Sequence, residues 1–380
     1  MKSKTINYSL GIILLLGLFF VSLLSPATPA VAYSTDSHIF INEIQYGHTA
    51  ATGGDFVEII GAARMNINNW TLRVYSDTGA LLETKNLTGT FVNQSNGFGT
   101  IVFNFTNLPD TRAGLALTNS TGTLVEFLSY GGSVSAMIDG TSRASTNIYT
   151  GTKLIEHTIG RRGLGDSSAD MFFSRTTPSN VPATQPETPG FINHYQKMGA
   201  TVFINEFIYR DEDYDNTKDK YEMVEVAAPS TKNLTGWYVE FYDGNGVRYA
   251  TPDKTLGLLN SLPLQNFAFG GAVPTNVVNG IGFTYHAWQN YSNVLNSYKG
   301  AIALMDPSGY VWHFISYGGT VTAVDGAAAG LVANDVGTVM ADGNAEYRSI
   351  MLFGDGRILS DFYWGDPDNK TLGVYNDEWR

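Results

Sequence analysis

The sequence contains no cysteine. This absence excludes disulfide bonds, a thiolate nucleophile and a lipid-modified cysteine, so the fold must rest on a hydrophobic core of its own. Basic residues are also few, because 23 Lys and Arg stand against 35 Asp and Glu, which gives a formal net charge of −12. A surface with this balance repels phosphate backbones, and we therefore do not expect the chain to bind nucleic acid.

The groups that commonly carry catalysis are scarce as well. The six histidines form no H-x-x-x-H or H-x-H pair of the kind that binds zinc. The chain also has no G-x-S-x-G motif, which marks the nucleophile of many hydrolases. The sequence therefore offers neither a common zinc site nor an activated serine.

Long apolar runs are confined to the N-terminus. Lys2 and Lys4 precede the run "LGIILLLGLFFVSLL", and the small-residue stretch "AVA" ends at Ala32. This pattern predicts a secretory signal peptide, residues 1–32, cleaved before Tyr33. No other run approaches the length of a membrane span, so we expect no transmembrane segment in the mature chain. The export signal leaves the periplasm, the cell surface and free secretion open as final locations.

The remaining sequence repeats itself. "FINEIQYG" from Phe40 returns as "FINEFIYR" from Phe203, and "GLALTNSTGTLVEFLSYGG" from Gly114 returns as "AIALMDPSGYVWHFISYGG" from Ala301. The ends agree too, as "TPGFIN" and "TLGVYN". Repeats in the same order over nearly the whole mature length indicate a duplicated domain. We predict a first domain over residues 33–196 and a second over residues 197–380.

Each copy consists of short runs rich in Val, Ile, Phe, Tyr and Thr, separated by Gly, Asn and Asp turns. This pattern predicts an all-β fold, and the turns "NSTG" and "DPSG" predict a hairpin at the same place in both copies. We expect two tandem β-sandwiches. Trp70 and Trp237 begin matching strands and are predicted core residues. His313 matches Glu126, and a position that accepts both residues predicts a solvent-facing strand site.

The order of the motifs resembles a known family. "INEI" or "INEF" is followed by "FVEI" or "MVEV", then by an Asn-x-x-x-Trp strand and by "LxxxxGxxVxFxSYxG". This succession resembles the lamin-tail domain of nuclear lamins and of many exported bacterial proteins. The resemblance implies an immunoglobulin-like β-sandwich, which in lamins is an interaction module and in bacterial proteins often accompanies extracellular hydrolases.

Acidic residues recur at equivalent places in the two copies. Asn42 and Glu43 match Asn205 and Glu206, while Glu58 and Glu225 follow one strand later. Two facing carboxylates could form a catalytic dyad. The same pair in both copies favours a structural role instead, in which the carboxylates satisfy hydrogen-bond donors near strand ends, and we predict no catalytic residue.

One acidic stretch, "DEDYDNTKDKYE", occurs only in the second copy. Its spacing matches a calcium-binding loop, with hard oxygen ligands from positions 1, 3, 5, 7, 9 and 12. Asn216 and Lys218 depart from the helical form of that motif, and a solvated acidic turn is the alternative. The site would be structural, and its predicted ligands are Asp211, Asp213, Asp215, Thr217, Asp219 and Glu222.

A second insertion, within about residues 258–298, is rich in aromatic residues. Aromatic side chains on a loop can insert into a partner's pocket or stack on sugar rings. We predict that Tyr285, Trp288 and Tyr291 bind a partner. The alternative is that these side chains cover the enlarged edge of the second sandwich.

The sequence thus predicts an exported, non-catalytic binding or surface-structural protein whose partner is an extracellular protein or a glycan. Two alternatives stay open. One is a secreted calcium-dependent hydrolase, either a nuclease or a phosphatase, and the other is a carbohydrate-binding module that uses the inserted aromatic residues.

Overall fold

The computed structural model describes twelve segments of the chain, all within the compact unit Ser34–Arg380. The predicted signal peptide lies outside them. The described residues are 38–47, 54–106, 108–150, 158–175, 188–193, 196–209, 221–249, 262–263, 276–278, 280–289, 298–337 and 348–376.

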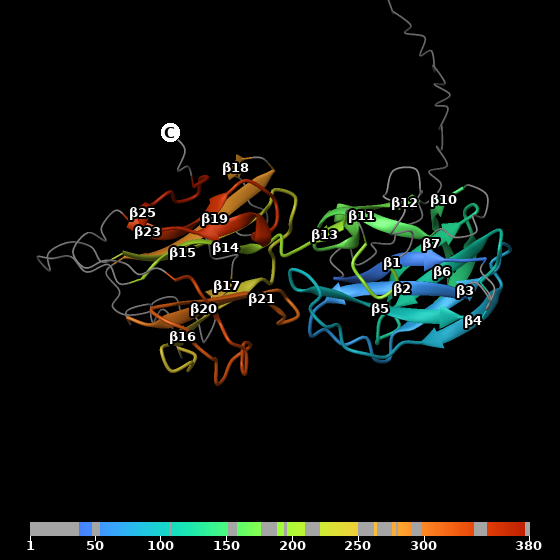
Figure 1. Ribbon diagram of the computed structural model, residues 1–380, viewed down its shortest axis with the longest axis horizontal. Helices are drawn as coiled ribbons and strands as arrows, with labels where there is room; N and C mark the ends of the chain where they lie inside the picture. The colour runs from blue at the N-terminus through green and yellow to red at the C-terminus, as the bar shows by residue number, and fades with distance from the viewer. Residues whose placement is uncertain are drawn as a thin grey trace, which may run out of the picture. The chain divides into compact units, whose positions relative to one another are not determined.

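The described residues up to Met198 form two main sheets (Figure 1). The first has the order β12-β11-β1-β2-β5, with β13 in parallel beside β11, and the second has the order β10-β7-β6-β3-β4. The strands of the first sheet are β1 (Ile39–Gln45), β2 (Asp55–Ala62), β5 (Phe98–Phe105), β11 (Ile159–Gly165), β12 (Met171–Arg175) and β13 (Gln196–Met198). Those of the second are β3 (Thr71–Tyr75), β4 (Leu81–Asn86), β6 (Ala113–Thr118), β7 (Leu124–Tyr130) and β10 (Thr146–Tyr149), while β8 (Ser135–Ile138) and β9 (Thr141–Ala144) form a hairpin.

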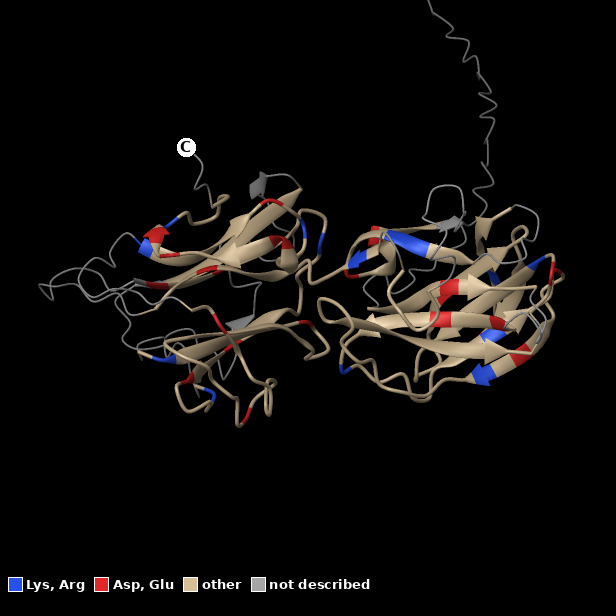
Figure 2. Ribbon diagram, in the orientation of Figure 1, with Lys and Arg blue, Asp and Glu red and all other residues tan. Residues whose placement is uncertain are grey.

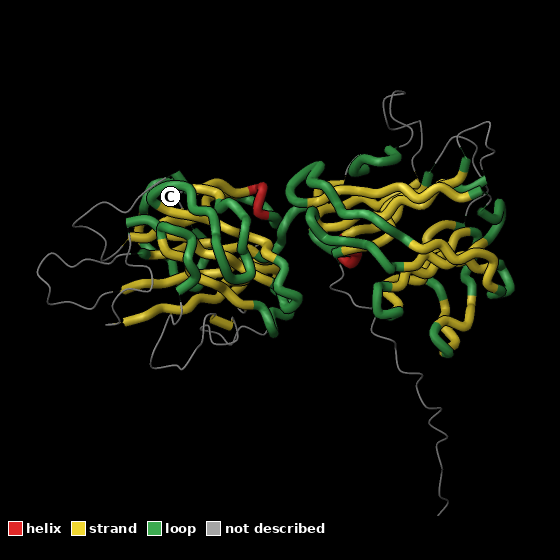
Figure 3. The backbone as a smooth tube through the Cα atoms, turned by 90° about the horizontal axis from the view of Figure 1, so that it is seen from below, coloured by secondary structure: helices red, strands yellow, loops and turns green. Residues whose placement is uncertain are grey.

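The described residues after Met198 form two further sheets. One has the order β18-β19-β15-β14-β23-β24, with β25 beside β23, and the other has the order β17-β16-β20-β21-β22. The first of these contains β14 (Phe203–Ile208), β15 (Tyr221–Pro229), β18 (Asn276–Val278), β19 (Ile281–Gln289), β23 (Arg348–Gly354), β24 (Phe362–Trp364) and β25 (Asp368–Asn369). The other contains β16 (Tyr238–Asp243), β17 (Leu262–Pro263), β20 (Gly300–Met305), β21 (Val311–Tyr317) and β22 (Asn334–Asp335). The described helices are single 3₁₀ turns, Ser168–Asp170 and Leu359–Asp361 (Figure 3).

Each pair of sheets shares one core, which gives the all-β sandwich that the strand pattern predicts. Ile41 and Ile59 of the first sheet pack in one cluster with Leu72, Leu115 and Val125 of the second. The corresponding cluster after Met198 contains side chains from β14, β15, β16, β20 and β21, among them Ile204, Val226, Val239, Ile302 and Ile315. Burying such side chains stabilises a fold by roughly 1.5 to 3 kcal/mol each, which suits a chain without disulfide bonds.

The predicted hairpin and one of the two predicted core tryptophans, Trp237, are confirmed. β6 pairs with β7 and β20 with β21, both antiparallel, across turns closed by bonds from Gly122 N to Asn119 O and from Gly309 N to Asp306 O. Trp237 is buried in its cluster, and Trp70 is partly buried against the matching one. Local turn chemistry and apolar patterning were therefore sufficient to place these elements.

A bulge interrupts the first strand of each repeat. The pairing of β1 with β2 shifts between Ile41 and Glu43, and that of β14 with β15 shifts between Ile204 and Glu206. The register skips Asn42 and Asn205, and the backbone amide of the residue just before each of them has its acceptor in a side chain of the facing sheet. In the first half Glu126 of β7 supplies it, because Ile41 N donates to Glu126 Oε2 at 2.9 Å. This hydrogen bond joins the two sheets of the sandwich.

In the second half, a histidine accepts the corresponding hydrogen bond. Ile204 N donates to His313 Nδ1 at 3.1 Å, and His313 is 6 % exposed. Burial lowers the pKa of His313 to about 3, so the ring stays neutral and Nδ1 can accept the hydrogen bond from Ile204 N. The prediction that His313 and Glu126 face solvent is wrong. The two residue types alternate at this position because both can accept a hydrogen bond inside the core.

Glu126 also has a buried cationic partner. Arg161 of β11 donates from Nη2 to Glu126 Oε1 and from Nε to Ile41 O at 2.7 Å, and both side chains are almost fully buried. Desolvation alone would disfavour either charge, so each depends on the other. The bulge, the acid and the arginine therefore form one unit that ties β1, β7 and β11 together.

We expect Glu126→Ala to lower the free energy of unfolding by about 3 to 5 kcal/mol, because it leaves the Arg161 charge and the Ile41 amide without an acceptor. Chemical denaturation of the full chain measures this change. Glu83→Ala is the matched control: Glu83 lies in β4 of the same half, 3.9 Å from Lys85 at the surface, and its loss should change the stability by less than about 1 kcal/mol. Equal effects of the two substitutions would contradict this account.

Candidate functional site: two buried glutamate pairs

The structure brings the four predicted glutamates together in two pairs. Glu43 of β1 lies opposite Glu58 of β2, and Glu206 of β14 lies opposite Glu225 of β15. All four are 0 % exposed. Facing positions on antiparallel strands place side chains about 4.5 to 5.5 Å apart at Cβ, so each pair holds two carboxyl groups side by side in the interior.

Hydrogen-bond donors surround the first pair. Asn42 Nδ2 donates to Glu58 Oε1 at 2.7 Å, and Gly190 N donates to Glu58 Oε2 at 2.6 Å. Thr188 Oγ1 donates to Glu43 Oε2 at 3.0 Å, and Thr158 Oγ1 donates to Glu43 Oε1. Each carboxylate oxygen therefore has a donor, which is the condition for burying such a group.

The second pair repeats this arrangement. Asn205 Nδ2 donates to Glu225 Oε1 at 2.7 Å, and Gly373 N donates to Glu225 Oε2 at 2.5 Å. Thr371 Oγ1 donates to Glu206 Oε2 at 2.8 Å, and Ser349 Oγ donates to Glu206 Oε1 at 2.6 Å. The donors at matching positions have the same chemistry, with Ser349 in the role of Thr158.

Two donors of each pair come from the hexapeptide at the end of the repeat, residues 188–193 or 371–376, which we call the closing hooks. The first residue of each hook gives its hydroxyl to one glutamate, and the third gives its amide to the other. Gly190 and Gly373 have φ values of 84° and 71°, a conformation that suits glycine. The last residue anchors the hook, because Asn193 Nδ2 donates to Asn42 O at 3.2 Å and Asn376 Nδ2 donates to Leu352 O at 2.8 Å.

Burial changes the acidity of these carboxyl groups. Desolvation, assisted by the neighbouring Glu43, raises the pKa of Glu58 from 4.5 to about 8, although Asn42 and Gly190 act in the other direction. Desolvation also raises the pKa of Glu225, with Glu206 adding to the effect. Glu206 is raised by burial as well, while Ser349, Thr371 and the charge of Lys370 lower its pKa. Glu58 is therefore mostly protonated at neutral pH.

The geometry of the two glutamate pairs fits a structural role, in which they bind the closing hooks, better than it fits a catalytic dyad. A general acid or base must reach a substrate proton, and a carboxylate pair that cleaves glycosides needs room for a sugar between its members. Here the carboxyl groups are fully buried and the closing hooks occupy their oxygens. Sequence comparison matched the two hooks with each other but gave no sign that they cover the glutamates, because that contact joins residues far apart in the chain.

The predicted calcium ligands lie almost wholly outside the described residues. Asp211, Asp213, Asp215, Thr217 and Asp219 are among them, and only Glu222 is described. Glu222 is the second residue of β15, 4 % exposed, and pairs in register with Trp288. Among the described residues no group of three or more His, Asp or Glu side chains is placed to hold a metal ion.

The predicted partner-binding residues are not all in a loop. Tyr285 and Trp288 lie in β19, which pairs with β15 as β5 pairs with β2, and the Tyr285 side chain is half-buried. The expectation of an inserted loop is wrong at these two positions, because this segment completes the sheet. Tyr291 lies outside the described residues.

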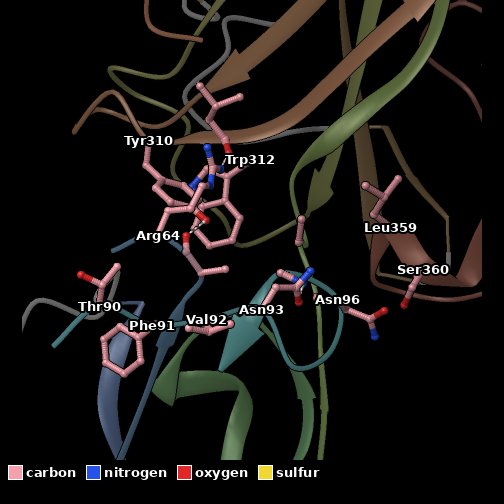
Figure 4. A pocket seen from close by; sticks show the side chains of 15 residues that line it. Arg64, Thr90, Phe91, Val92, Asn93, Asn96, Tyr310, Trp312, Leu359 and Ser360 are labelled. Atoms are coloured by element: carbon pink, nitrogen blue, oxygen red, sulfur yellow. Dashed lines mark hydrogen bonds between the residues drawn. The ribbon is translucent and has the colours of Figure 1, made fainter. Parts of the chain in front are cut away.

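A hollow of about 740 Å³ is the feature that sequence reasoning missed (Figure 4). Tyr310, Trp312 and Arg64 lie close together on one side of it, where Tyr310 Oη donates to Ala63 O at 2.6 Å and Arg64 Nη2 donates to Val311 O at 3.0 Å. Its volume is that of a small-molecule pocket. No Asp, Glu or His is among its lining residues in the described part of the chain, so it offers no carboxylate or imidazole base.

Charged residues do not mark a further site. Figure 2 shows the described Lys and Arg residues dispersed over strands and turns, with no basic stripe among them. In the described part of the chain, no helix has the length and apolar character needed to cross a membrane.

The raised pKa of Glu58 predicts a pH dependence. The folded protein keeps a proton on Glu58 that the unfolded chain loses above pH 4.5, so this group stabilises the fold fully below pH 4.5 and loses its contribution as the pH rises through about 8. The free energy of unfolding should fall by up to about 1.4 kcal/mol per pH unit in this window. Denaturation of the full chain across the window should show a shallower decline in Glu58→Gln than in the unchanged protein. Glu83→Gln, at the surface, should leave the slope unaltered, and parallel curves for the unchanged protein and Glu58→Gln would refute the assignment.

Comparison with known proteins adds little to these observations. No family model matches the chain, and a search of curated proteins finds no match. Among solved structures, the exo-chitosanase CsxA of Amycolatopsis orientalis is similar to 72 % of this chain at 13 % identity, with a TM-score of 0.17. The similar region spans 26 % of the chitosanase chain.

Proposed function

We propose that this chain is an exported, non-catalytic binding or surface-structural protein built from two tandem lamin-tail-like, immunoglobulin-like β-sandwich domains. The observation that carries the proposal is the state of the two glutamate pairs, which are the best candidates for acid–base chemistry in the sequence. Their carboxyl groups are buried and bonded to the closing hooks. A carboxyl group that is buried and hydrogen-bonded in this way stabilises the fold and is inaccessible to a substrate.

The duplication supports the same proposal. Both halves keep the bulge, the glutamate pair and the hook, while they differ in the residues that surround them. Conserving internal bonds and varying surface loops suits a scaffold that presents binding surfaces. The proposed partner is an extracellular protein or a glycan, and Tyr285, Trp288 and Tyr291 are the proposed contact residues.

We expect purified chain lacking residues 1–32 to turn over no member of a panel of phosphate esters, nucleic acids, polysaccharides and peptides, with and without calcium. Glu206→Gln and Glu225→Gln, checked for folding by circular dichroism, serve as the matched variants. Turnover that either substitution abolishes, and that Glu83→Gln retains, would replace this proposal with a secreted hydrolase. Binding to a glycan array without turnover would identify the partner as a carbohydrate.

We further propose a structural calcium ion bound by Asp211, Asp213, Asp215, Thr217, Asp219 and Glu222. Calcium at a hundred times its dissociation constant should add about 2.7 kcal/mol to the stability of the fold. Thermal melting in millimolar calcium should then rise by about 2 to 4 °C for each kcal/mol gained. Asp213→Ala combined with Asp215→Ala should remove the rise, whereas Asp77→Ala combined with Glu83→Ala, two exposed acids outside the loop, should not. An unchanged melting curve would exclude the site.

A further inference from the structure

Two N-x-T sequences are left unused by the fold. Asn86-Leu-Thr88 and Asn104-Phe-Thr106 each have the form that accepts N-linked glycans in secreted proteins. The asparagine and threonine side chains of both are exposed. Among the described residues, the carboxamides of Asn86 and Asn104 have no hydrogen-bond partner, so nothing in the sandwich requires asparagine at these places.

The other described N-x-T sequences have a structural explanation. In Asn69-Trp70-Thr71 the hydroxyls of Thr71 and Thr118 are hydrogen-bonded to each other at 2.5 Å, and in Asn233-Leu234-Thr235 the amide of Thr235 donates to Asn233 Oδ1 at 2.9 Å. In Asn119-Ser-Thr121 the carboxamide oxygen accepts bonds from the amides of Thr121 and Thr123 and thereby closes the hairpin turn. In Asn369-Lys-Thr371 the threonine hydroxyl belongs to a closing hook. These motifs would be retained for folding alone, which is why they carry less weight.

The two unused sequences lie on the terminal strands of their sheets. Asn86 is the last residue of β4, at the end of the order β10-β7-β6-β3-β4, and Asn104 lies in β5, at the end of β12-β11-β1-β2-β5. Terminal strands present backbone groups that can pair with another chain. On β4, Leu81 and Leu82 are 55 % and 54 % exposed, which adds apolar surface to that risk.

The two edges also adjoin each other. Lys85 Nζ, next to Asn86, donates to Asn104 O at 2.5 Å and lies 4.5 Å from the centre of the Phe105 ring. The two asparagines therefore occupy one rim of the first sandwich, where the terminal strands of both sheets meet. A large hydrated group on either residue would cover this rim.

We propose that Asn86 and Asn104 are sites of N-linked glycosylation, and that the glycans cover the edge strands β4 and β5. The proposal rests on the export proposed above, because the modification takes place beyond the membrane. The donor is an oligosaccharide linked through phosphate to a membrane lipid. A bond forms between Nδ2 of asparagine and the anomeric carbon of the sugar, and the bond from that carbon to the phosphate oxygen breaks. Nδ2 loses one proton, and the lipid phosphate leaves with the bonding electron pair.

The test uses the full chain purified from the extracytoplasmic fraction of cells that make it naturally. Mass spectrometry of its peptides should show glycan mass on the peptides that contain Asn86 and Asn104, and none at the exposed Asn334, which is followed by Asp335 and Val336 and lacks the required threonine. Thr88→Ala should abolish the modification of Asn86 only, and Thr106→Ala that of Asn104 only. The matched controls Thr88→Ser and Thr106→Ser keep a hydroxyl and should keep the glycans.

The possible failures can be told apart. An exported chain, processed at its N-terminus and bare at Asn86 and Asn104, would overturn the glycosylation proposal and leave export intact. A chain found only inside the cell with Met1 still attached would overturn both. Glycan that persists in Thr88→Ala and Thr106→Ala would show that the modification does not depend on these sequences and would also contradict the proposal.

Discussion

The need to satisfy polar groups inside the β-sandwich is the constraint on which the rest of this structure depends. A bulge interrupts β1 and β14 next to a backbone amide whose acceptor is a side chain of the facing sheet, and a carboxyl pair is buried beside each bulge. Such groups destabilise a fold by about 1 to 3 kcal/mol each when they lack partners. The chain supplies the partners from distant places, with Glu126 or His313 for the amide and a closing hook for the carboxyl pair.

This constraint explains which differences between the two halves are tolerated. Glu126 with Arg161 and the neutral His313 are chemically unlike, but each offers one acceptor to the bulge amide. Thr158 and Ser349 likewise each bring one hydroxyl to the first glutamate of a pair. At these positions, both halves have a side chain that can form the required hydrogen bond, whereas its charge and size differ between the halves. The buried network also fixes the position of each closing hook, because the amides of Gly190 and Gly373 must reach Glu58 and Glu225, respectively.

The same bonds bear on function. The acids that look most catalytic in the sequence are buried and hydrogen-bonded to the closing hooks. Among the described residues, three surface features stand out: the hollow beside Tyr310 and Trp312, the half-buried Tyr285 on β19, and the rim where β4 and β5 meet. The hollow and the rim are each formed by segments that are not adjacent in the chain.

The sequence by itself determined the strand content, the matching hairpins at Asn119 and Asp306, and the core position of Trp237. These features follow from local rules, since turn residues and apolar alternation act over a few neighbours. Only the tertiary structure decided that Glu126 and His313 face inward, that Tyr285 and Trp288 belong to a strand, and that the hooks close over the glutamates. Those outcomes depend on which distant groups meet in the interior, where a hydrogen-bond partner decides whether a polar residue can be buried.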